Sequence, residues 1–372
     1  MWTANLFQVT TGSIGPRVNF KDLTWSISLN DIESCSIDVT KTDLPSLNLN
    51  YWLSPWWAGI LVMWDGVPIF AGPIVSRPAE SFNTIRVECR GIRALFERRY
   101  LIAEVSDMLD LSRSKVRFDG KDYGTMAQKA VQFGMAKPGG YVPIVFPYPE
   151  LASSVLDDDH TRTVYSGYEG DSVNVHNVLS ELAAKTNGPD IMFRPRLIDG
   201  NSLVWDMLHG TESDPTIPQK TSPIWDTTAV NGQVTDLDIV TTGTYQSNRM
   251  YITGDGSNEQ TRMAVAMDNL SLSQGFPLLE GFKAVGSSVR DAGPALNAAN
   301  AALKANKDSL VEIQLTVRAD GEHRLGTFWP GDEVQLITKG WLSLKDGTHR
   351  LRLLNINGST DGNVRMSLQT ER

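Results

Sequence analysis

The sequence predicts a mainly β protein with α+β insertions, and three observations support this fold class. Apolar and polar residues alternate with period two over much of the first ninety residues, as expected of strands with one buried face. Between about residues 92 and 210, apolar residues recur at helical spacing among short strand-like runs. From about residue 230 the strand pattern returns and continues to the C-terminal end. The length of 372 residues allows roughly two to four domains.

The first strands are predicted as hairpins. Leu23–Leu29 and Cys35–Val39 both alternate, and turn-forming residues separate them. The run Gly59–Trp64 is apolar on both faces, so we expect it to be covered on both sides. Asp65 and Gly66 follow it and predict a tight turn, because a type I′ turn needs positive φ at both central residues.

After this turn the sequence predicts a strand over 67–75 and another over 82–90. Short strands at such close spacing are typical of a small barrel or sandwich. The middle region then predicts helices and one further hairpin. The expected helices cover 92–101, 125–135 and 171–186, and the hairpin strands are 191–196 and 202–208.

The C-terminal third predicts mostly strands, interrupted by one Ala-rich helix that starts after Pro294. Two turns punctuate this region. The first turn consists of Trp329, Pro330, Gly331 and Asp332, and the second turn consists of Asp346 and Gly347. The expected strands are 234–240, 249–253, 262–266, 311–317, 334–337, 351–356 and 364–368.

The net charge of −9 argues against a surface that wraps nucleic acid through bulk positive charge. Only two cysteines occur, Cys35 and Cys89, and both lie in predicted strands. We expect them to be buried free thiols. The longest apolar stretch, 56–64, is about half of the roughly 20 residues that a membrane-spanning helix needs. We therefore expect no membrane segment and no export signal.

Catalytic motifs of the common hydrolases and nucleotide-binding proteins are missing from the sequence. Asp157, Asp158, Asp159 and His160 form the most metal-like cluster. Adjacent loop residues seldom point at one centre, so we expect a solvated acidic loop and no metal or cofactor. Paired carboxylates could serve a hydrolase, but any protein with 43 acidic residues offers such pairs. We expect no enzymatic activity.

Aromatic and basic residues give the more specific signal. Trp52, Trp56, Trp57 and Trp64 lie close together, as in a sugar-stacking platform, a subunit interface or a core. An arginine patch follows, and it could form salt bridges to an acidic neighbouring subunit. We expect the tryptophan cluster to contribute to the core and to a subunit interface, and not to a sugar-binding platform. The candidate interface residues are Trp52, Trp56, Trp57, Trp64, Phe70, Arg90, Arg93, Arg98 and Arg99.

The order of these elements resembles a known family. Two stretches carry the first part of the likeness, 64–74 (WDGVPIFAGPI) and 91–101 (GIRALFERRYL). Near the end, 318–332 (beginning RADG and ending LGTFWPGD) and 346–350 (DGTHR) carry the second. Together they look like the minor tail proteins of long-tailed actinobacterial phages, a family related to the central baseplate hub of contractile phages.

The resemblance implies two small β-barrels of the phage hub type and a mixed α/β middle domain. It implies a homotrimeric ring at the virion tail tip, made in the bacterial host cytoplasm. Expected partners are the distal tail protein, the tape-measure protein and other minor tail or fibre proteins. Because the chain ends soon after the second barrel would end, we expect a hub without a fibre or hydrolase extension. The expected domains are a first barrel (1–91), a mixed domain (92–210), a β-rich segment with a helix near 294–308 (211–310), and strands completing the second barrel (311–372).

Two other functions stay open at this point. One is a carbohydrate-binding receptor protein of the same tail tip, which would need an exposed tryptophan groove. The other is a peptidoglycan hydrolase. For the hub, the acidic composition predicts a neutral-to-acidic channel that lets DNA pass without binding it, because phosphate backbones are held by Lys and Arg clusters.

Overall fold

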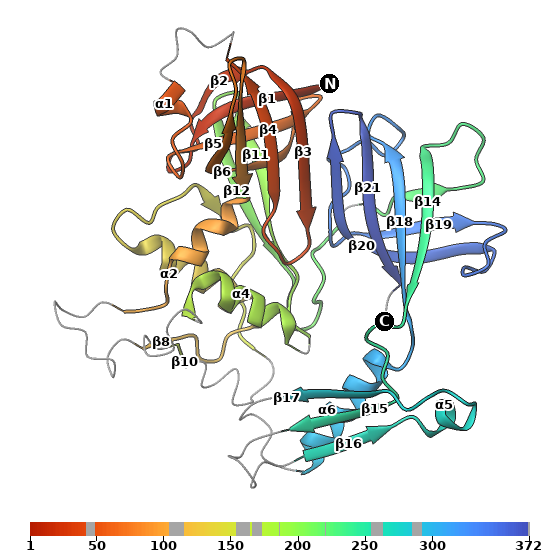
Figure 1. The fold of residues 1–372 in the computed structure, drawn as a ribbon. Helices are drawn as coiled ribbons and strands as arrows, with labels where there is room; N and C mark the ends of the chain where they lie inside the picture. Colours follow the sequence, from red (N-terminus) through yellow and green to blue (C-terminus); the bar gives the residue numbers. More distant parts are fainter. Residues whose placement is uncertain are drawn as a thin grey trace. The chain divides into compact units, whose positions relative to one another are not determined.

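The computed structural model describes residues 1–41, 49–103, 115–153, 164–165, 173–185, 187–219, 221–253, 263–284 and 292–370 (Figure 1). The chain forms two compact units. Unit 1 contains Met1–Asp236 and Leu315–Leu368, and unit 2 contains Leu237–Gln314 with Gln369–Arg372. The chain is mainly β, as predicted, with a small helical share.

The N-terminal part of unit 1 is built almost entirely from strands. The predicted strands 23–29, 35–39, 59–64, 67–75 and 82–90 are all confirmed, with small changes at their ends. The elements are β1 (Trp2–Gln8), β2 (Ile14–Val18), β3 (Phe20–Ser28), β4 (Ser34–Thr40), α1 (Leu49–Trp52), β5 (Ala58–Trp64), β6 (Val67–Glu80) and β7 (Thr84–Arg90).

Strand β5 is covered on both faces, as its composition predicted. Ile60, Leu61 and Val62 have no exposed surface, although successive side chains of a strand point to opposite faces. Leu61 belongs to a core that also contains Phe7 from β1 and Trp205 from the middle of the chain. The chain itself therefore supplies the cover of this strand, and no neighbouring subunit is needed for it.

The turn between β5 and β6 is the predicted one. Asp65 has φ of 48° and Gly66 has φ of 82°, so both central residues adopt the left-handed conformation of a type I′ turn. The flanking strands pair in antiparallel register, with Trp64 opposite Val67.

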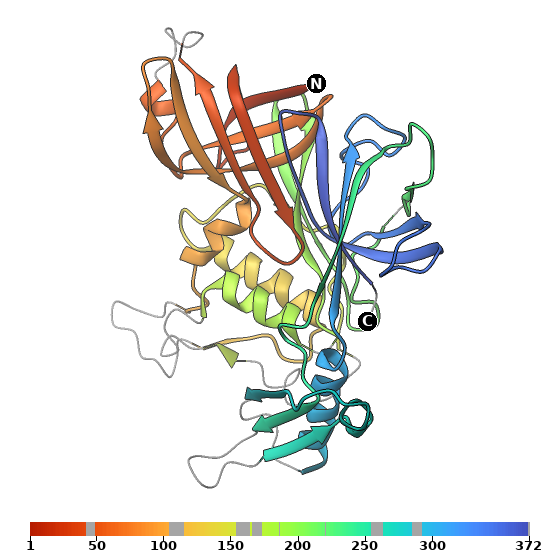
Figure 2. The same ribbon diagram turned by 45° about the vertical axis from the view of Figure 1, so that its right-hand side comes forward.

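The middle of unit 1 packs two helices against the strand core. The predicted helix 125–135 is confirmed as α2, and Asp122 caps its N-terminus by accepting from the backbone N–H of Gly124 and Thr125. Helix α4 starts after Asn174, which is its N-cap, and the predicted start at Asp171 lies outside the described residues. Figures 1 and 2 show α2 and α4 side by side. The elements are the 3-10 helix η1 (Ile92–Arg98), β8 (Val116–Arg117), α2 (Tyr123–Ala136), β9 (Ile144–Val145), β10 (Val164–Tyr165), α4 (Val175–Ala184), β11 (Ile191–Asp199) and β12 (Ser202–His209).

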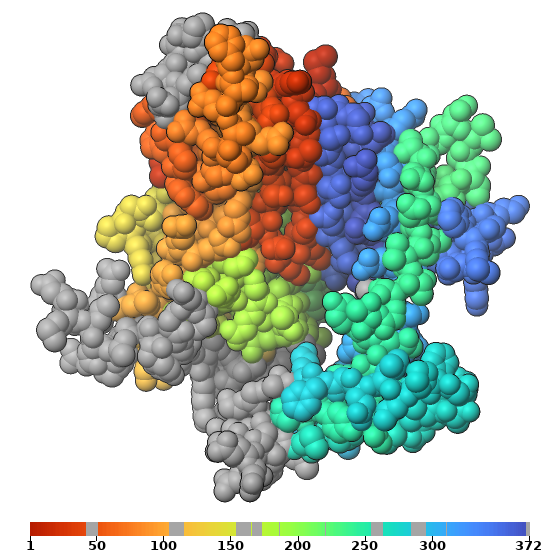
Figure 3. All heavy atoms as spheres, viewed as in Figure 1, coloured from red at the N-terminus to blue at the C-terminus, as the bar shows by residue number. Residues whose placement is uncertain are grey.

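The C-terminal strands join the N-terminal strands in one sheet. Strand β20 pairs antiparallel with β3, with Ile356 opposite Ile27. In Figure 3 the red N-terminal and dark-blue C-terminal atoms lie in direct contact along this line. The elements are β13 (Ile224–Asp226), β14 (Val234–Thr242), β18 (Leu310–Arg318), β19 (Glu333–Thr338), β20 (Gly347–Ser359) and β21 (Asn363–Thr370).

This sheet has 13 strands, and its main path runs β14-β18-β21-β20-β3-β4-β7-β6-β5-β1-β2. Strand β19 pairs with β20 and with β13 off this path. Within the described ranges no sheet closes on itself, so the two closed barrels expected from the sequence are not confirmed.

Unit 2 is a three-stranded sheet with one long helix. The helix α6 begins at Ala292 and not after Pro294 as predicted, so Pro294 lies in its first turn, where a missing N–H has no cost. Met250, Ile252 and Ala266 from the sheet pack with Ala299 and Leu303 from the helix. The elements are β15 (Arg249–Thr253), β16 (Met263–Met267), α5 (Asn269–Ser273), β17 (Glu280–Ala284) and α6 (Ala292–Asn306).

Candidate functional site

The described residues contain no candidate metal site, and their two cysteines are buried. Among the residues described, no group of three or more His, Cys, Asp or Glu side chains could hold a metal ion. The acidic run Asp157–His160 lies outside the described residues. Cys35 and Cys89 are opposite each other on β4 and β7 and are buried free thiols, as predicted. Burial raises the pKa of both thiols, which leaves them unreactive.

The structure brings together two of the predicted interface residues, Trp56 and Arg98. The guanidinium carbon of Arg98 lies 5.2 Å from the centre of the Trp56 ring, within range of a cation–π interaction. Trp56 has φ of 66°, which is unusual for a bulky side chain. The hydrogen bond from its backbone N–H to the carbonyl oxygen of Ile74 (2.8 Å) fixes this conformation. Trp56 is half-buried and Arg98 is exposed, so this pair lies at the surface.

Three further aromatic rings lie on the same chain segment. The Tyr51 and Trp57 rings have centroids 4.0 Å apart, and Trp52 contacts both in edge-on geometry. Trp52 also packs on Gly15 of β2, where a side chain would collide with its ring. Tyr51 remains 50% exposed, and the two tryptophans are half-buried. We call Tyr51, Trp52, Trp56, Trp57 and Arg98 the aromatic–arginine surface. Its chemistry suits protein contact, since Trp, Tyr and Arg dominate binding energies at interfaces.

The other arginines of the predicted patch are engaged within the chain. Arg90 forms a two-point ion pair with Glu97, at 2.5 and 2.8 Å. Arg99 donates to the carbonyl oxygen of Gly140 and lies over the Phe96 ring. Arg93 is 1% exposed, and its Nη2 donates to Ser180 Oγ at 2.8 Å. The Arg93 contact attaches η1 to α4, and the Arg90 contact attaches η1 to β7.

Two predicted interface residues need correction. Phe70 and Arg93 are each 1% exposed, so they have no surface left for a neighbouring subunit. Phe70 faces inward because it sits on β6 beside the doubly covered β5. Trp64 lies elsewhere, at the end of β5, in the wall of a pocket that is also lined by Trp2 and Phe20.

The predicted turn at Trp329–Asp332 is present and is closed by its own aspartate. The Asp332 carboxylate accepts from the Trp329 backbone N–H at 2.8 Å, and Gly331 has φ of 96°. Burial raises the Asp332 pKa to about 6, against the opposing effects of that hydrogen bond and of Arg194. At the second turn, Asp346 accepts from the Gly340 N–H, and Gly347 begins β20. Both turns are structural.

Sequence reasoning missed Trp2 and Phe20, which line the same pocket as Trp64. Trp2, Ala4 and Leu6 alternate with less apolar residues, so period-two analysis could have found β1 and its first tryptophan. In the part of the chain that the structure describes, no helix is long and apolar enough to cross a membrane.

No family model matches the sequence, and a search of curated proteins found no match. Solved structures do match, over nearly the whole chain. The tail protein from Neisseria meningitidis MC58 is 15% identical with a TM-score of 0.58, and the match covers 100% of this chain and 97% of that one. The 43 kDa tail protein of prophage MuSo2 from Shewanella oneidensis is 13% identical with a TM-score of 0.61, over 99% and 98% of the two chains.

A third match is the E. coli c3393 protein, a type VI secretion component described as similar to the T4 tail proteins gp27 and gp5. It is 10% identical with a TM-score of 0.50, over 99% of this chain and 77% of that one. This chain therefore has the fold of phage tail proteins.

Proposed function

We propose that this chain is a structural subunit of a phage tail tip. Three copies would form a ring that caps the tail tube, anchors host-recognition proteins and leaves a channel for DNA. The observation that carries this proposal is the match to two phage tail proteins over 97% or more of both chains. A match of that extent covers far more of the chain than a shared turn or hairpin would.

The aromatic–arginine surface supports assembly with protein partners. Its rings are held rigidly by one another and by Gly15, so little side-chain entropy is lost when a partner covers them. We propose that it contacts the next copy in the ring. In this proposal the predicted interface role falls to Trp52, Trp56, Trp57 and Arg98, whereas Arg90 and Arg99 would contribute at most from the edge.

Unit 2 supports assembly independently. Helix α6 covers one face of its sheet, and the other face carries large exposed apolar side chains. Phe282 is 67% exposed and Met263 is 58% exposed, and Val265 and Met267 lie on the same face. Tyr251 is opposite Val265 on one side and Phe282 on the other, so the apolar strip is continuous across three strands. Monomeric proteins rarely expose contiguous patches of this kind.

We propose a second copy of this chain as the cover of that open face. Arg249 and Glu280, the charged pair among its strands, form an ion pair with each other at 3.4 Å. The face is therefore close to neutral. Two copies of a chain with a net charge of −9 can approach there with less repulsion than at an average part of the surface.

For the rest of the hub we propose the arrangement expected from the sequence. The two ends of the large sheet would correspond to the two small barrels, with the domain limits given above. The partners would be the distal tail, tape-measure and fibre proteins of a long-tailed actinobacterial phage. Residues 205–240 contain six acids and one lysine. Facing the channel, they would repel DNA and not retain it. We propose no enzymatic activity.

The test is copy number and symmetry. Mass photometry of the purified chain should give a trimer, and a reconstruction of the intact particle should show three copies around a neutral-to-acidic channel. One or six copies per tail, or a strongly basic pore, would contradict the proposal. Clearing on a peptidoglycan zymogram would contradict the absence of enzymatic activity.

A further inference from the structure

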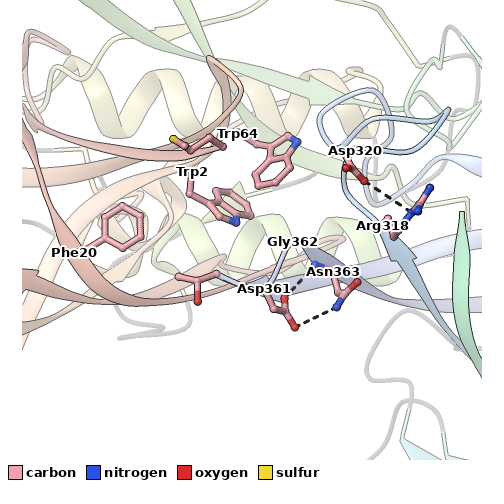
Figure 4. Close-up of a pocket in the computed structure, with 10 residues that line it drawn as sticks. Trp2, Phe20, Trp64, Arg318, Asp320, Asp361, Gly362 and Asn363 are labelled. Atoms are coloured by element: carbon pink, nitrogen blue, oxygen red, sulfur yellow. Dashed lines mark hydrogen bonds and ion pairs between the residues drawn. The ribbon is translucent and has the colours of Figure 1, made fainter.

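A pocket of about 620 Å³ opens in unit 1 between strands from the two ends of the chain. Figure 4 shows its two walls. Trp2, Phe20 and Trp64 form one wall, and they come from β1, β3 and β5. The other wall comes from the end of β18 and from the turn between β20 and β21, and it contains Arg318, Asp320, Asp361 and Asn363. The volume lies within the range of about 300–1,000 Å³ that is typical of small-ligand sites.

The aromatic wall is preorganised by packing. Trp2 and Trp64 are opposite each other in the β1–β5 register, and their rings meet edge to face with centroids 4.9 Å apart. The Trp2 ring also contacts Trp25, which is 2% exposed and packs on Gly358. Trp2 itself is 9% exposed, and its Nε1 and that of Trp64 are both buried without an acceptor among the described residues.

The polar wall is held together by backbone hydrogen bonds. The Ala319 N–H donates to the carbonyl oxygen of Gly362 at 2.9 Å, which joins the end of β18 to the β20–β21 turn. Asp361 accepts from the backbone N–H of Asn363 at 3.1 Å and so shapes that turn. The side chains of Arg318 and Asp320 lie 3.9 Å apart and remain 52% and 72% exposed. They can therefore exchange partners at little cost.

The chemistry of the two walls selects a class of ligand. The aromatic wall offers apolar ring surface, since the indole nitrogens of Trp2 and Trp64 are themselves buried. The polar wall offers acceptors at Asp320 and Asp361, donors at Arg318, and both kinds of group at Asn363 and Thr360. A ligand that satisfies both needs an apolar face and an edge whose groups donate as well as accept. Hydroxyl groups do both.

From these contacts we infer that the pocket binds a saccharide, with one sugar ring against Trp2 and Trp64 and its hydroxyl groups toward Asp320, Asp361 and Arg318. A phosphate ligand would meet two carboxylates, and a purely apolar ligand would leave the polar wall without partners. This site is separate from the aromatic–arginine surface, and the inference does not depend on the trimer.

Saturation-transfer NMR and calorimetry with a defined panel test this inference. The panel contains chitotriose, maltotriose, mannotriose, lactose, rhamnose and arabinotriose, each at about 10 mM so that weak binding is seen. We expect at least one saccharide to bind. Asp320→Asn and Trp64→Ala should each weaken its affinity about tenfold or more.

Matched controls are Asp308→Asn, whose carboxylate is 83% exposed in unit 2, and Trp341→Ala, which is 38% exposed and outside the pocket. Both should leave binding unchanged. Asp320 is exposed, so its variant keeps the test valid if Trp64→Ala fails to fold. The inference would be overturned if no saccharide of the panel binds, or if Asp320→Asn and Trp64→Ala leave the binding unchanged. Mass photometry of the same samples reports trimer formation separately. A failure of saccharide binding can therefore be told apart from a failure of trimer formation.

Discussion

Asn355 in β20 donates from Nδ2 to Ser28 Oγ in β3 at 2.7 Å, which joins two residues that are 327 positions apart. The same amide group is also within hydrogen-bond distance of Ser26 Oγ (3.0 Å) and the Ile27 carbonyl oxygen (3.1 Å). Asn355 is the register partner of Ser28. One side chain thus links the N-terminal and C-terminal strands of the large sheet at the line where they meet.

Replacing Asn355 should therefore destabilise unit 1 as a whole. Asn355→Ala removes the donor from several half-buried acceptors, and we expect a loss of about 2 kcal/mol in the free energy of unfolding. Urea denaturation followed by tryptophan fluorescence measures it. Asn83→Ala, at an exposed position before β7, is the matched control and should change stability by less than about 0.5 kcal/mol. Equal effects of the two variants would show that the link contributes nothing specific.

This link also shows where prediction from the sequence ends. Hairpins such as β3–β4 and β5–β6 were predictable, because alternation and turn residues lie close together along the chain. The pairing of β20 with β3 leaves no local pattern, since any two alternating strands could pair. The parallel pairing of β13 with β19 could not be predicted from the sequence for the same reason. Hence most strands of the large sheet were found, with β1, β2 and β13 missed, but the single open sheet that they form was not predicted.

The Asp65–Gly66 turn gives a prediction about backbone conformation alone. Gly66 has φ of 82°, and a Cβ added there would meet no atom within 4 Å. Gly66→Ala should cost about 1 kcal/mol in the free energy of unfolding, because an L-residue is strained in this region even where space is free. Gly200→Ala in the β11–β12 turn is the control, since Gly200 has equal space without positive φ. It should be close to neutral, and a similar loss at both sites would refute the strain argument.

Glu33, which precedes β4, and Arg93 in η1 are both buried ionisable residues, and the charge of each affects the pKa of the other. Glu33 is 7% exposed, and its carboxylate lies against Gly91, where a Cβ would collide with Oε2. Burial raises the pKa of Glu33 from 4.5 to about 7, although its backbone hydrogen bond and the Arg93 charge both act to lower it. Burial also lowers the pKa of Arg93 to about 10.

A raised carboxyl pKa means that the folded state holds the proton more tightly than the unfolded state does. The resulting stabilisation is complete below pH 4.5 and is lost as the pH rises through about 7. We expect Glu33→Gln, which mimics the protonated form, to resemble the wild type near pH 4.5. At pH 8 it should be more stable by about 3 kcal/mol. Denaturation of both proteins across this range is the measurement, with the exposed Glu322→Gln as control. A constant difference at all pH values would contradict the assignment.

For the candidate site, the residue types were predictable and their arrangement was not. The density of Trp and Arg residues marked the region 52–99, and Trp56 and Arg98 do meet. Nothing in the sequence shows that Trp56 adopts a positive φ, because that conformation is favoured by Gly and Asn. Arg93 looked like its neighbours in sequence, but it is buried because η1 turns it toward Ser180. The fold decides which arginine reaches the surface.

The open face of unit 2 predicts a charge-sensitive contact. Phe282→Asp places a carboxylate on the apolar strip without disturbing the core on the α6 side, since Phe282 is 67% exposed. We expect the proposed trimer to dissociate at concentrations about tenfold higher than for the wild type, because the contact would have to bury an unpaired charge. Mass photometry over a dilution series measures this. The control, Phe82→Asp, alters a 94% exposed phenylalanine in unit 1 and should leave the trimer intact.

The aromatic–arginine surface makes the sharpest prediction for assembly, because two residues can be tested as a pair. Trp56→Ala and Arg98→Ala should each weaken trimer formation, and the double variant should be little worse than either single one. Non-additivity of this kind is expected when two residues in contact act on the same partner. The single variants should cost about 1–2 kcal/mol in association free energy, as for typical interface hot spots.

Arg86→Ala is the matched control, since Arg86 pairs with Asp38 on the exposed side of β7. It should affect neither trimer formation nor the stability of the fold by more than a few tenths of a kcal/mol. Strictly additive losses would mean that Trp56 and Arg98 act independently, and no loss in either variant would exclude this surface from the subunit contact.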